Sequence, residues 1–378
     1  MERKKKVIVF GSYIFSLVNF RKNLLIDLVA RGYEVLTLAP GRDAAVEEEL
    51  ASLGIRFQSI PLSRTGLNPL GDLLTLVEIR NIIRSFRPTL LITYTIKPVI
   101  YGNLVAGFYP GIKKLALITG LGYLDTGKKT LLKRIIQRTI HRLYRYALRN
   151  LQFIAFQNPD DQFYFSEHDL LTNRTAVTIT AGSGVDLSHY KRAKPVLAPA
   201  TFLLIARLIK AKGIEQYLEA ARVLKPECGD RVTFRLIGML DDENPDSIDE
   251  ATINGLHREG IIEYLGFQKD VRDSLASSSV FVLPSYYREG TPRTILEALA
   301  SGKPVITTDN PGCRETVIDG RNGFLIPVKD PVQLANAMRK FIYEPSLIAE
   351  MGEESYRLAQ TKYNVTLVNK HLFDFAGI

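Results

Sequence analysis

The chain has 378 residues, of which 46% are hydrophobic and 24% are charged, a balance close to that of soluble globular proteins. This composition excludes an intrinsically disordered chain, a fibrous protein and a bundle of membrane spans. The 49 basic and 40 acidic side chains give a net charge of +9. Residues 1–186 (25 basic, 15 acidic) carry the whole excess, whereas residues 187–378 (24 basic, 25 acidic) are nearly neutral.

Short apolar runs alternate with longer amphipathic stretches throughout the first half of the chain, the pattern of a parallel α/β sheet. The predicted strands are Val7–Phe10, Val35–Leu38, Leu90–Thr93, Leu115–Ile118, Phe153–Phe156 and Ala176–Ile179. The predicted helices are Phe20–Arg31, Leu70–Phe86, Tyr101–Phe108, Thr130–Arg149 and Asp160–Glu167.

The same pattern repeats in the second half. Its predicted strands are Phe202–Ala206, Thr233–Ile237, Ile262–Leu265, Val280–Leu283, Val305–Thr307 and Gly323–Ile326. Its predicted helices are Ile214–Leu224, Ser247–Arg258, Val271–Ser278, Thr294–Ser301 and Pro331–Phe341, followed by a helical stretch over Glu350–Phe375. The strands are continuously apolar, which indicates that both faces of each sheet are covered.

The repeated pattern predicts an α/β protein with two doubly wound, Rossmann-like domains. We place the first at residues 1–186 and the second at 187–360, with the break near 182–200. In such sheets ligands bind at the carboxyl ends of the strands, so the two domains are expected to face one another across a ligand-binding cleft.

The number of cysteines and the first apolar run indicate the cellular compartment in which the protein is expected. Two cysteines are too few for a disulfide framework and fit a reducing compartment. The apolar run Val7–Phe10 is too short for the core of a signal peptide, and no stretch reaches the roughly 18 apolar residues of a spanning helix. We expect a cytoplasmic protein.

Two phosphate-loop patterns can be weighed early. The segment after the first strand, Gly11–Ser16, has a single glycine, which argues against a dinucleotide-dependent dehydrogenase. The segment Gly122–Lys129 matches GxxxxGK, but the next position is Lys129 where a P-loop needs the Ser or Thr that holds Mg²⁺. A P-loop ATPase is therefore an alternative of low weight.

A stronger constellation lies in the second half. Arg207 follows the strand Phe202–Ala206, and Lys212 comes five residues later, just before a helix. Two cations at the carboxyl end of a strand can neutralise a pyrophosphate. Each could also be an ordinary surface charge, and taken alone that is the better interpretation.

The strand Val280–Leu283 leads into a second part of this constellation, the segment Glu289–Glu297. Gly290 allows close approach of backbone to a ligand. Thr291 is expected to cap a helix, with Pro292 at the first helical position followed by Arg293, so that the N–H groups of Thr294 and Ile295 form an anion site. Glu289 and Glu297 are then placed to flank one ligand without touching; otherwise both are only charges favoured by the helix dipole.

Here the sequence resembles a known family. It resembles retaining glycosyltransferase family 4, which has the GT-B fold, in two features of the second half. The first is the pair of cations Arg207 and Lys212. The second is the pair of carboxylates Glu289 and Glu297, which are separated by seven residues that include the sequence Gly-Thr-Pro. Further matching segments are Leu265–Val271, Leu283–Ser285, Glu297–Ile306 and Gly323–Leu325. The resemblance covers nearly the whole chain and is most specific in the second half.

The resemblance implies a UDP-sugar donor as substrate, no required cofactor and no dedicated metal site. Arg207 and Lys212 would hold the diphosphate, and Glu297 would hold the ribose hydroxyls. The transferred sugar would be contacted by Glu289, Gly290 and Thr291. The phosphate would be contacted by Pro292, Arg293, Thr294 and Ile295. The base would be bordered by the segment 266–271, which contains Phe267. By the same analogy, a C-terminal helix at 361–378 would pack back on the first domain.

A finer resemblance concerns the acceptor. Leu62–Pro69, Gly120–Gly122 and Asp241–Pro245 resemble bacterial transferases that extend lipid-linked saccharides for O-antigen, capsule or protein glycans. The nearest of these add an α-1,3-linked N-acetylhexosamine, often N-acetylgalactosamine, to a polyprenyl-diphosphate-linked saccharide. A different sugar donor or a soluble acceptor is the alternative.

In one place the sequence departs from the family. Many members have a pocket histidine after a central strand of the first domain, but here that region reads Leu90–Pro98 and contains no histidine. Lys97 is the polar candidate for the catalytic position, with an ordinary loop lysine as the even alternative. We add Ser16, after the first strand, to the donor-binding set.

The resemblance implies that the sugar keeps its anomeric configuration. Retaining glycosidases place a carboxylate close to the anomeric carbon, which makes Glu289 the catalytic candidate. Whether Glu289 attacks the sugar or only orients it stays open. A sugar-nucleotide-binding protein without turnover is the alternative from another class, and the intact Glu289 and Glu297 pair argues against it. A further alternative is an inverting transferase or an epimerase with the same two-domain architecture, but those enzymes lack the spacing of Glu289 and Glu297.

The excess charge of the first half is concentrated in one segment. Eight Lys or Arg residues lie within Lys128–Arg149, and residues 126–159 contain no Asp or Glu. Apolar residues recur at Leu132, Ile135, Ile136, Ile140, Leu143 and Ala147, which predicts an amphipathic helix. We expect its apolar stripe to face the core and its charges to face an anionic membrane, which makes the protein peripheral to the inner face of the cell membrane. No nucleic-acid-binding motif accompanies the charge, so no nucleic acid partner is expected.

Overall fold

The computed structural model describes residues 5–63, 69–121, 131–241, 244 and 246–378. The chain forms two compact units, and each is described here by itself. Unit 1 comprises Met1–Ser183 and Val368–Ile378, and unit 2 comprises Gly184–Leu367. The GxxxxGK segment Gly122–Lys129 lies outside the described residues.

Unit 1 is built on a parallel sheet in the order β3-β2-β1-β4-β5-β6-β7. The order reverses between β1 and β4, which is the mark of a doubly wound sheet. The strands are β1 (Lys6–Phe10), β2 (Glu34–Ala39), β3 (Arg56–Ser59), β4 (Leu90–Tyr94), β5 (Lys113–Ile118), β6 (Phe153–Phe156) and β7 (Ala176–Ile179).

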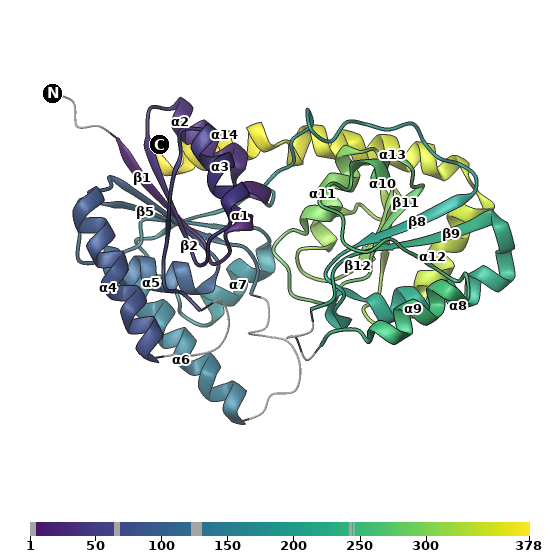
Figure 1. Ribbon diagram of the computed structural model, residues 1–378, viewed down its shortest axis with the longest axis horizontal. Helices are drawn as coiled ribbons and strands as arrows, with labels where there is room; N and C mark the ends of the chain where they lie inside the picture. Colours follow the sequence, from purple (N-terminus) through teal and green to yellow (C-terminus); the bar gives the residue numbers. More distant parts are fainter. Residues whose placement is uncertain (1–4, 64–68, 122–130, 242–243, 245) are drawn as a thin grey trace. The chain divides into compact units, whose positions relative to one another are not determined.

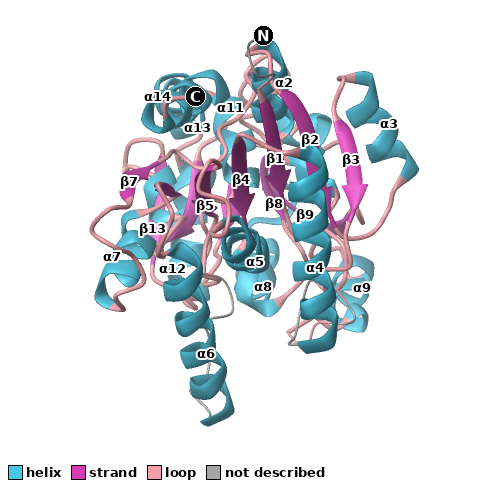
Figure 2. Ribbon diagram, turned by 90° about the vertical axis from the view of Figure 1, so that its left-hand side faces the viewer, coloured by secondary structure: helices cyan, strands magenta, loops and turns pink. Residues whose placement is uncertain are grey.

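Helices cover both faces of the unit 1 sheet (Figures 1 and 2). They are α1 (Phe15–Asn19), α2 (Lys22–Ala30), α3 (Ala44–Ser52), α4 (Pro69–Phe86), α5 (Ile96–Ala106), α6 (Leu131–Leu148), α7 (Pro159–Glu167) and α14 (Val365–Ala376). One apolar core joins α4, α5, α6 and α7 to the sheet, and a second core joins α1, α2, α3 and α14 to its other face.

Unit 2 has the same plan, with a parallel sheet in the order β10-β9-β8-β11-β12-β13. Its strands are β8 (Ala200–Ile205), β9 (Val232–Ile237), β10 (Glu263–Tyr264), β11 (Val280–Leu283), β12 (Val305–Thr308) and β13 (Gly323–Ile326). Its helices are α8 (Ile214–Cys228), α9 (Glu250–Arg258), α10 (Arg272–Ala276), α11 (Arg293–Ala300), α12 (Pro331–Tyr343) and α13 (Ser346–Leu358).

The prediction of two Rossmann-like domains is therefore confirmed for each unit. Every residue of β8 and β11 is buried, as the continuous apolar runs indicated. A few elements differ from the predictions. The predicted helix Phe20–Arg31 is α2, Lys22–Ala30, and the short helix α1, Phe15–Asn19, precedes it without having been predicted. Helix α5 begins at Ile96 rather than Tyr101, which places Lys97 in its first turn rather than in a loop.

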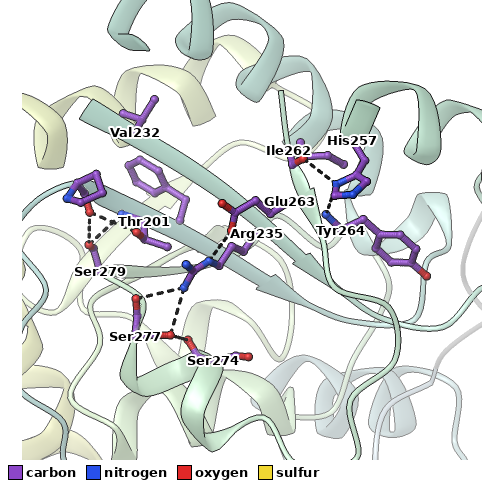
Figure 3. Close-up of polar contacts among 12 residues, drawn as sticks. Thr201, Val232, Arg235, His257, Ile262, Glu263, Tyr264, Ser274, Ser277 and Ser279 are labelled. Atoms are coloured by element: carbon purple, nitrogen blue, oxygen red, sulfur yellow. Dashed lines mark hydrogen bonds and ion pairs between the residues drawn. The ribbon is translucent and has the colours of Figure 1, made fainter. Parts of the chain in front are cut away.

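The edge strand β10 has only two residues, and side chains hold it in place. Arg235 on β9 reaches Glu263 on β10 at 2.8 Å and Ser277 at 3.1 Å, and the N–H of Tyr264 donates to His257 Nδ1 at 3.3 Å (Figure 3). The Tyr264 hydroxyl also donates to the carbonyl of Gly238, at 3.0 Å. These bonds fix the start of the loop that leads to Phe267.

Helix α6 matches the predicted amphipathic helix. Tyr144, Ala147 and Leu148 are in the core, whereas Ile135, nearer its beginning, is 52% exposed. The core-facing stripe is therefore confirmed for the second half of the helix only. The first half extends beyond the edge of the sheet in both views (Figures 1 and 2).

Among the helices that the structure describes, none is long and apolar enough to cross a bilayer.

Candidate functional site

The carboxyl edge of the unit 2 sheet gathers most of the predicted donor-site residues. Strands β8 and β11 are neighbours and run parallel, so the segments that follow them leave the sheet on the same side. Arg207 and Lys212 follow β8, and Glu289 and Gly290 follow β11. Topology therefore brings together segments about 80 positions apart in the sequence, the separation of Lys212 and Glu289 being 77.

A tight turn at Gly213 sets the position of Lys212. The chain forms a short 3₁₀ helix over Lys210–Lys212, and Gly213 then takes a left-handed conformation with φ of 76°. A Cβ at Gly213 would lie 2.1 Å from the carbonyl oxygen of Pro284. Only glycine permits this approach, which puts Lys212 against the loop that follows β11.

Lys212 and Glu289 form an ion pair inside the site. The Lys212 ammonium donates to Glu289 Oε1, and each side chain is only 13% exposed. The Ser285 hydroxyl donates to the same oxygen at 3.1 Å. The ammonium predicted to meet the diphosphate thus touches the carboxylate predicted to meet the sugar.

Backbone contacts hold the loop that carries Glu289. The N–H groups of Tyr286 and Tyr287 both donate to the Ala211 carbonyl at 2.9 Å, and Asn310 donates to the Tyr287 carbonyl at 2.8 Å. A Cβ at Gly312 would lie 2.0 Å from the Gly290 carbonyl oxygen. The loop is therefore built against two neighbouring segments and presents Glu289 from a fixed backbone.

Arg207 lies further out and has its own partner. Its guanidinium is 3.3 Å from Asp241 Oδ2, and its side chain is 41% exposed. A diphosphate at this edge would compete with Asp241 for the guanidinium. Asp241 belongs to the segment Asp241–Pro245, of which residues 242, 243 and 245 lie outside the described residues.

The beginning of α11 differs from the prediction. The N-cap is Pro292, with extended backbone, and no side chain caps the helix, so the prediction that Thr291 caps it and that Pro292 is the first helical residue is wrong. Proline fits the position because an N-cap residue needs no N–H donor of its own. The N–H of Ile295 donates to the Pro292 carbonyl at 3.2 Å, and a phosphate would share that donor, while Thr294 lies beside it in the first turn.

Glu297 lies on the second turn of α11 and is nearly buried, with 8% of its surface exposed. Arg293, one turn earlier, donates to its carboxylate at 3.1 Å and also to the Gly184 carbonyl at 2.9 Å. Tyr190 forms a hydrogen bond with the same carboxylate. Burial raises the pKa of Glu297, and the Arg293 charge opposes that shift. The carboxylate is thus held in a fixed orientation, as an acceptor of hydroxyl groups needs.

Phe267 stands out from the same edge. It is 67% exposed and follows Gly266, whose φ is 65° and whose carbonyl accepts a hydrogen bond from the N–H of Gly238 at 3.0 Å. An exposed aromatic ring on a fixed loop can stack on a flat ligand.

The predicted residues of unit 1 lie at the carboxyl edge of its own sheet. Lys97, in the first turn of α5, is 3.1 Å from Asp72 on α4, and both side chains are largely buried. Burial and Asp72 together raise the pKa of the adjacent Tyr101. Thr95, the N-cap of α5, has a φ of 67°, a strained value for a threonine and one that tends to occur at functional sites.

Ser16 has internal partners. It is 5% exposed, and its hydroxyl lies 2.8 Å from the Tyr94 hydroxyl at the end of β4. Burial raises the pKa of Tyr94 to about 12. A role for Ser16 in donor binding stays a prediction.

Four residues of the unit 2 edge were not predicted as site residues. Tyr190 carried no signal in the sequence, whereas Ser285 and Asp241 lay in segments that resemble the family but had no role assigned to them. The fold places Tyr190, Ser285, Asp241 and Gly312 beside Glu297, Glu289, Arg207 and Gly290 respectively. Gly312 had a weak signal, because it follows the strand β12 in a turn-rich run.

We expect Gly213→Ala to lower the free energy of unfolding by more than about 3 kcal/mol, because both the left-handed backbone and the contact with Pro284 oppose a Cβ. Urea unfolding measures the loss. Gly260→Ala is the matched control, since Gly260 has a φ of 69° with open space around it. Its cost should be about 1 kcal/mol, the cost of the backbone alone. Equal losses in the two variants would contradict the role of the Pro284 contact.

The chain is similar to known proteins in both of its halves. The family model described as "Glycosyl transferases group 1" matches residues 190–358, and the model "Glycosyl transferase 4-like" matches residues 14–158. The chain is 26% identical over 358 residues to the N,N'-diacetylbacillosaminyl-diphospho-undecaprenol alpha-1,3-N-acetylgalactosaminyltransferase of Campylobacter jejuni, covering 90% of each chain. It is 30% identical over 200 residues to the putative colanic acid biosynthesis glycosyltransferase WcaL of Escherichia coli, covering 50% of this chain and 48% of that one.

The fold is shared with solved structures. Sucrose-phosphate synthase of Thermosynechococcus elongatus matches with a TM-score of 0.79 at 17% identity, and the two chains each match over 98% of their length. HepE of Anabaena, solved in complex with UDP and glucose, matches with a TM-score of 0.78 at 18% identity over 99% of each chain. The group 1 model matches the second half of the chain, the 4-like model matches the first half, and each unit has a Rossmann-like fold, so the chain is identified as a glycosyltransferase.

Proposed function

We propose that this glycosyltransferase transfers an N-acetylhexosamine from a UDP-sugar to a polyprenyl-diphosphate-linked saccharide during assembly of a bacterial surface polysaccharide or protein glycan. The ion pair of Lys212 and Glu289 at the carboxyl edge of unit 2 carries the transferase part of the proposal, because it sets a cation for a diphosphate beside a carboxylate for a sugar. The relative in Campylobacter jejuni supports N-acetylgalactosamine, the α-1,3 linkage and the lipid-linked acceptor.

The chemistry makes a clear demand on the protein. The bond between the anomeric carbon and the diphosphate oxygen breaks, a bond to the acceptor hydroxyl oxygen forms, and the hydroxyl proton leaves. Negative charge grows on the diphosphate, and Arg207 and Lys212 are the side chains that meet it. Glu289 faces the positive charge that develops on the sugar, and Glu297 holds the ribose hydroxyls.

We further propose that the anomeric configuration is retained. Glu289 is held by Lys212 and Ser285 on a loop whose backbone is fixed, so its carboxylate can stay close to the reacting carbon. NMR of the product, which distinguishes α from β linkages, tests retention directly when the donor has an α-linked diphosphate.

A screen of UDP-sugars against a short-chain polyprenyl-diphosphate saccharide tests the function. We expect transfer of one N-acetylhexosamine, with UDP-N-acetylgalactosamine the best donor. Because two cations of the protein meet the diphosphate, we expect the rate to survive addition of EDTA. Turnover of ATP with no transfer from any UDP-sugar would refute the proposal, and a rate that depends on added divalent metal would refute the metal-independent part.

We also propose that α6 rests against the anionic inner face of the cell membrane. The cations of α6 whose side chains the structure describes are Arg134, Arg138, Arg142 and Arg145, and Arg149 directly follows the helix. None of the exposed residues of α6 from Arg134 onward is acidic. Arg145 donates to the carbonyls of His168 and Asp169, whereas Arg134, Arg138 and Arg142 are exposed. Such a face suits anionic headgroups.

The double substitution Arg138→Gln/Arg142→Gln should weaken binding to anionic vesicles about 30-fold, since each cation near the surface contributes about 1 kcal/mol. Vesicle co-sedimentation measures it. The matched control is Arg222→Gln/Arg258→Gln, which removes two exposed cations from unit 2. Equal binding to neutral and anionic vesicles would count against the proposal.

A further inference from the structure

Helix α4 has an apolar outer face that the fold leaves uncovered. Leu70, Leu73, Leu74 and Val77 are 78%, 57%, 61% and 48% exposed. Their spacing of three and four residues places them on one side of the helix. The opposite side is also apolar, because Ile79, Ile82, Ile83 and Phe86 lie in the core of unit 1.

This arrangement is unusual for a surface helix. Single exposed apolar residues are common and need no explanation, but a run of four on one face marks an interaction surface. The face needs no apolar residues for the fold, because the core contacts of α4 come from its other side.

Cations continue the same face. Arg80 and Arg84 follow Val77 at the same spacing, both exposed and without an ion pair among the described residues. None of the exposed residues of α4 from Leu70 onward is acidic. Asp72 and Glu78, the acidic residues of the helix, are half-buried and bonded to Lys97 and Gln58.

The position of this face in unit 1 adds a second observation. Helices α4 and α6 lie on the two sides of α5 on the same face of the sheet, and their first halves both reach beyond its carboxyl edge (Figures 1 and 2). The exposed arginines of α6 therefore belong to the same side of unit 1 as the α4 face. The Lys97 and Asp72 pair lies at this edge, and Asp72 is two residues from Leu70 and directly precedes Leu73.

We propose that the outer face of α4, defined by Leu70, Leu73, Leu74, Val77, Arg80 and Arg84, inserts its apolar residues into an anionic bilayer. The occupant is a bilayer because the face joins apolar and cationic residues along one helix, the arrangement of a helix that lies in the membrane interface. Arg80 and Arg84 meet the headgroups, and the leucines enter the acyl region below them. The inference rests on the proposed function, because the enzyme must reach a lipid-linked acceptor at a membrane.

The two helices then contribute different forces. The arginines of α6 attract the anionic surface, and salt weakens that attraction. The leucines of α4 are removed from water, and salt does not weaken that contribution. Binding should therefore keep a salt-resistant part that belongs to α4.

Vesicle co-sedimentation of the full chain tests this, with phosphatidylcholine vesicles that do or do not contain phosphatidylglycerol, at low and high salt. Leu73→Ser/Leu74→Ser should lose affinity for the anionic vesicles by at least about tenfold, and the loss should persist at high salt. Phe108→Ser is the matched control, because Phe108 is 76% exposed and lies after α5, at the amino edge of the sheet. Both variants alter exposed side chains and should unfold at the wild-type temperature.

Unchanged vesicle binding of Leu73→Ser/Leu74→Ser would overturn the inference. So would light scattering that shows a dimer in the wild type and a monomer in this variant, since the face would then belong to a second copy. Transfer to the short-chain polyprenyl-diphosphate saccharide, assayed without vesicles, separates the two proposals. If Leu73→Ser/Leu74→Ser transfers sugar to that acceptor at the wild-type rate but binds vesicles more weakly, the inference is supported. If neither the variant nor the wild type transfers sugar, while the variant still binds vesicles more weakly, only the proposed function is refuted.

Discussion

Glu289→Gln should reduce the rate of sugar transfer on the order of a hundred- to ten-thousand-fold while affinity for UDP stays near that of the wild type. The substitution removes the negative charge but keeps an oxygen that Lys212 and Ser285 can bond, so the loop keeps its structure. Only the stabilisation of positive charge on the reacting sugar is lost. Initial rates and calorimetric titration with UDP measure the two quantities.

Glu215→Gln is the matched control for this result. Glu215 is a half-exposed carboxylate of the same unit that pairs with Lys210 at 3.6 Å, and its loss should leave the rate unchanged. Near-normal turnover in Glu289→Gln would refute the catalytic assignment. Loss of UDP binding together with turnover would instead assign Glu289 to the nucleotide site.

The second large effect is expected at Arg207. Arg207→Ala should weaken binding of UDP by about 10- to 100-fold, the value of a hydrogen bond between charged groups. The half-exposed side chain has no role in the core, so the thermal stability should not change. Titration of the variant with UDP measures the loss, and unchanged affinity would contradict the assignment.

Asp241→Asn provides a test with the opposite sign. Asp241 holds the Arg207 guanidinium at 3.3 Å, and its charge repels a diphosphate that approaches the same group. The variant should therefore bind UDP more tightly than the wild type. A weaker affinity would show that Asp241 positions Arg207 for the ligand rather than competing with the ligand.

Hydrophobic patterning predicted the sheets well because most strands are buried on both faces. The bounds of β6, β7, β11 and β13 match the predicted ranges residue for residue. The edge strand β3 was missed because three of its four residues, Arg56–Ser59, are polar and none is fully buried. Helix α3 was missed because Ala44–Ser52 is rich in glutamate. In both cases contacts with distant parts of the chain decide the structure: β3 pairs with β2, and α3 packs against the core through Val46 and Leu50. A pattern within one segment does not contain this information.

The candidate site was predictable only in part. The spacing of Glu289 and Glu297 around Gly290 pointed to the donor site, but it did not show that Lys212 touches Glu289 or that Arg293 and Tyr190 hold Glu297. Those contacts depend on the parallel pairing of β8 and β11 and on the turn at Gly213. The ion pair of Lys97 with Asp72 likewise joins two helices, α5 and α4, and the sequence of neither helix predicts how the two pack together.

The path of the chain has a consequence for biosynthesis. The larger segment of unit 1, Met1–Ser183, is synthesised before unit 2, yet Leu372, Phe373 and Ala376 of α14 belong to the core of unit 1. Unit 2, at Gly184–Leu367, is continuous in sequence and can fold as soon as it is synthesised. Because domains generally fold as units during synthesis, unit 1 begins first but is completed last, when its final helix is released. Until then the sheet face that α14 covers is open to chaperones, and a chain that stops early leaves it so.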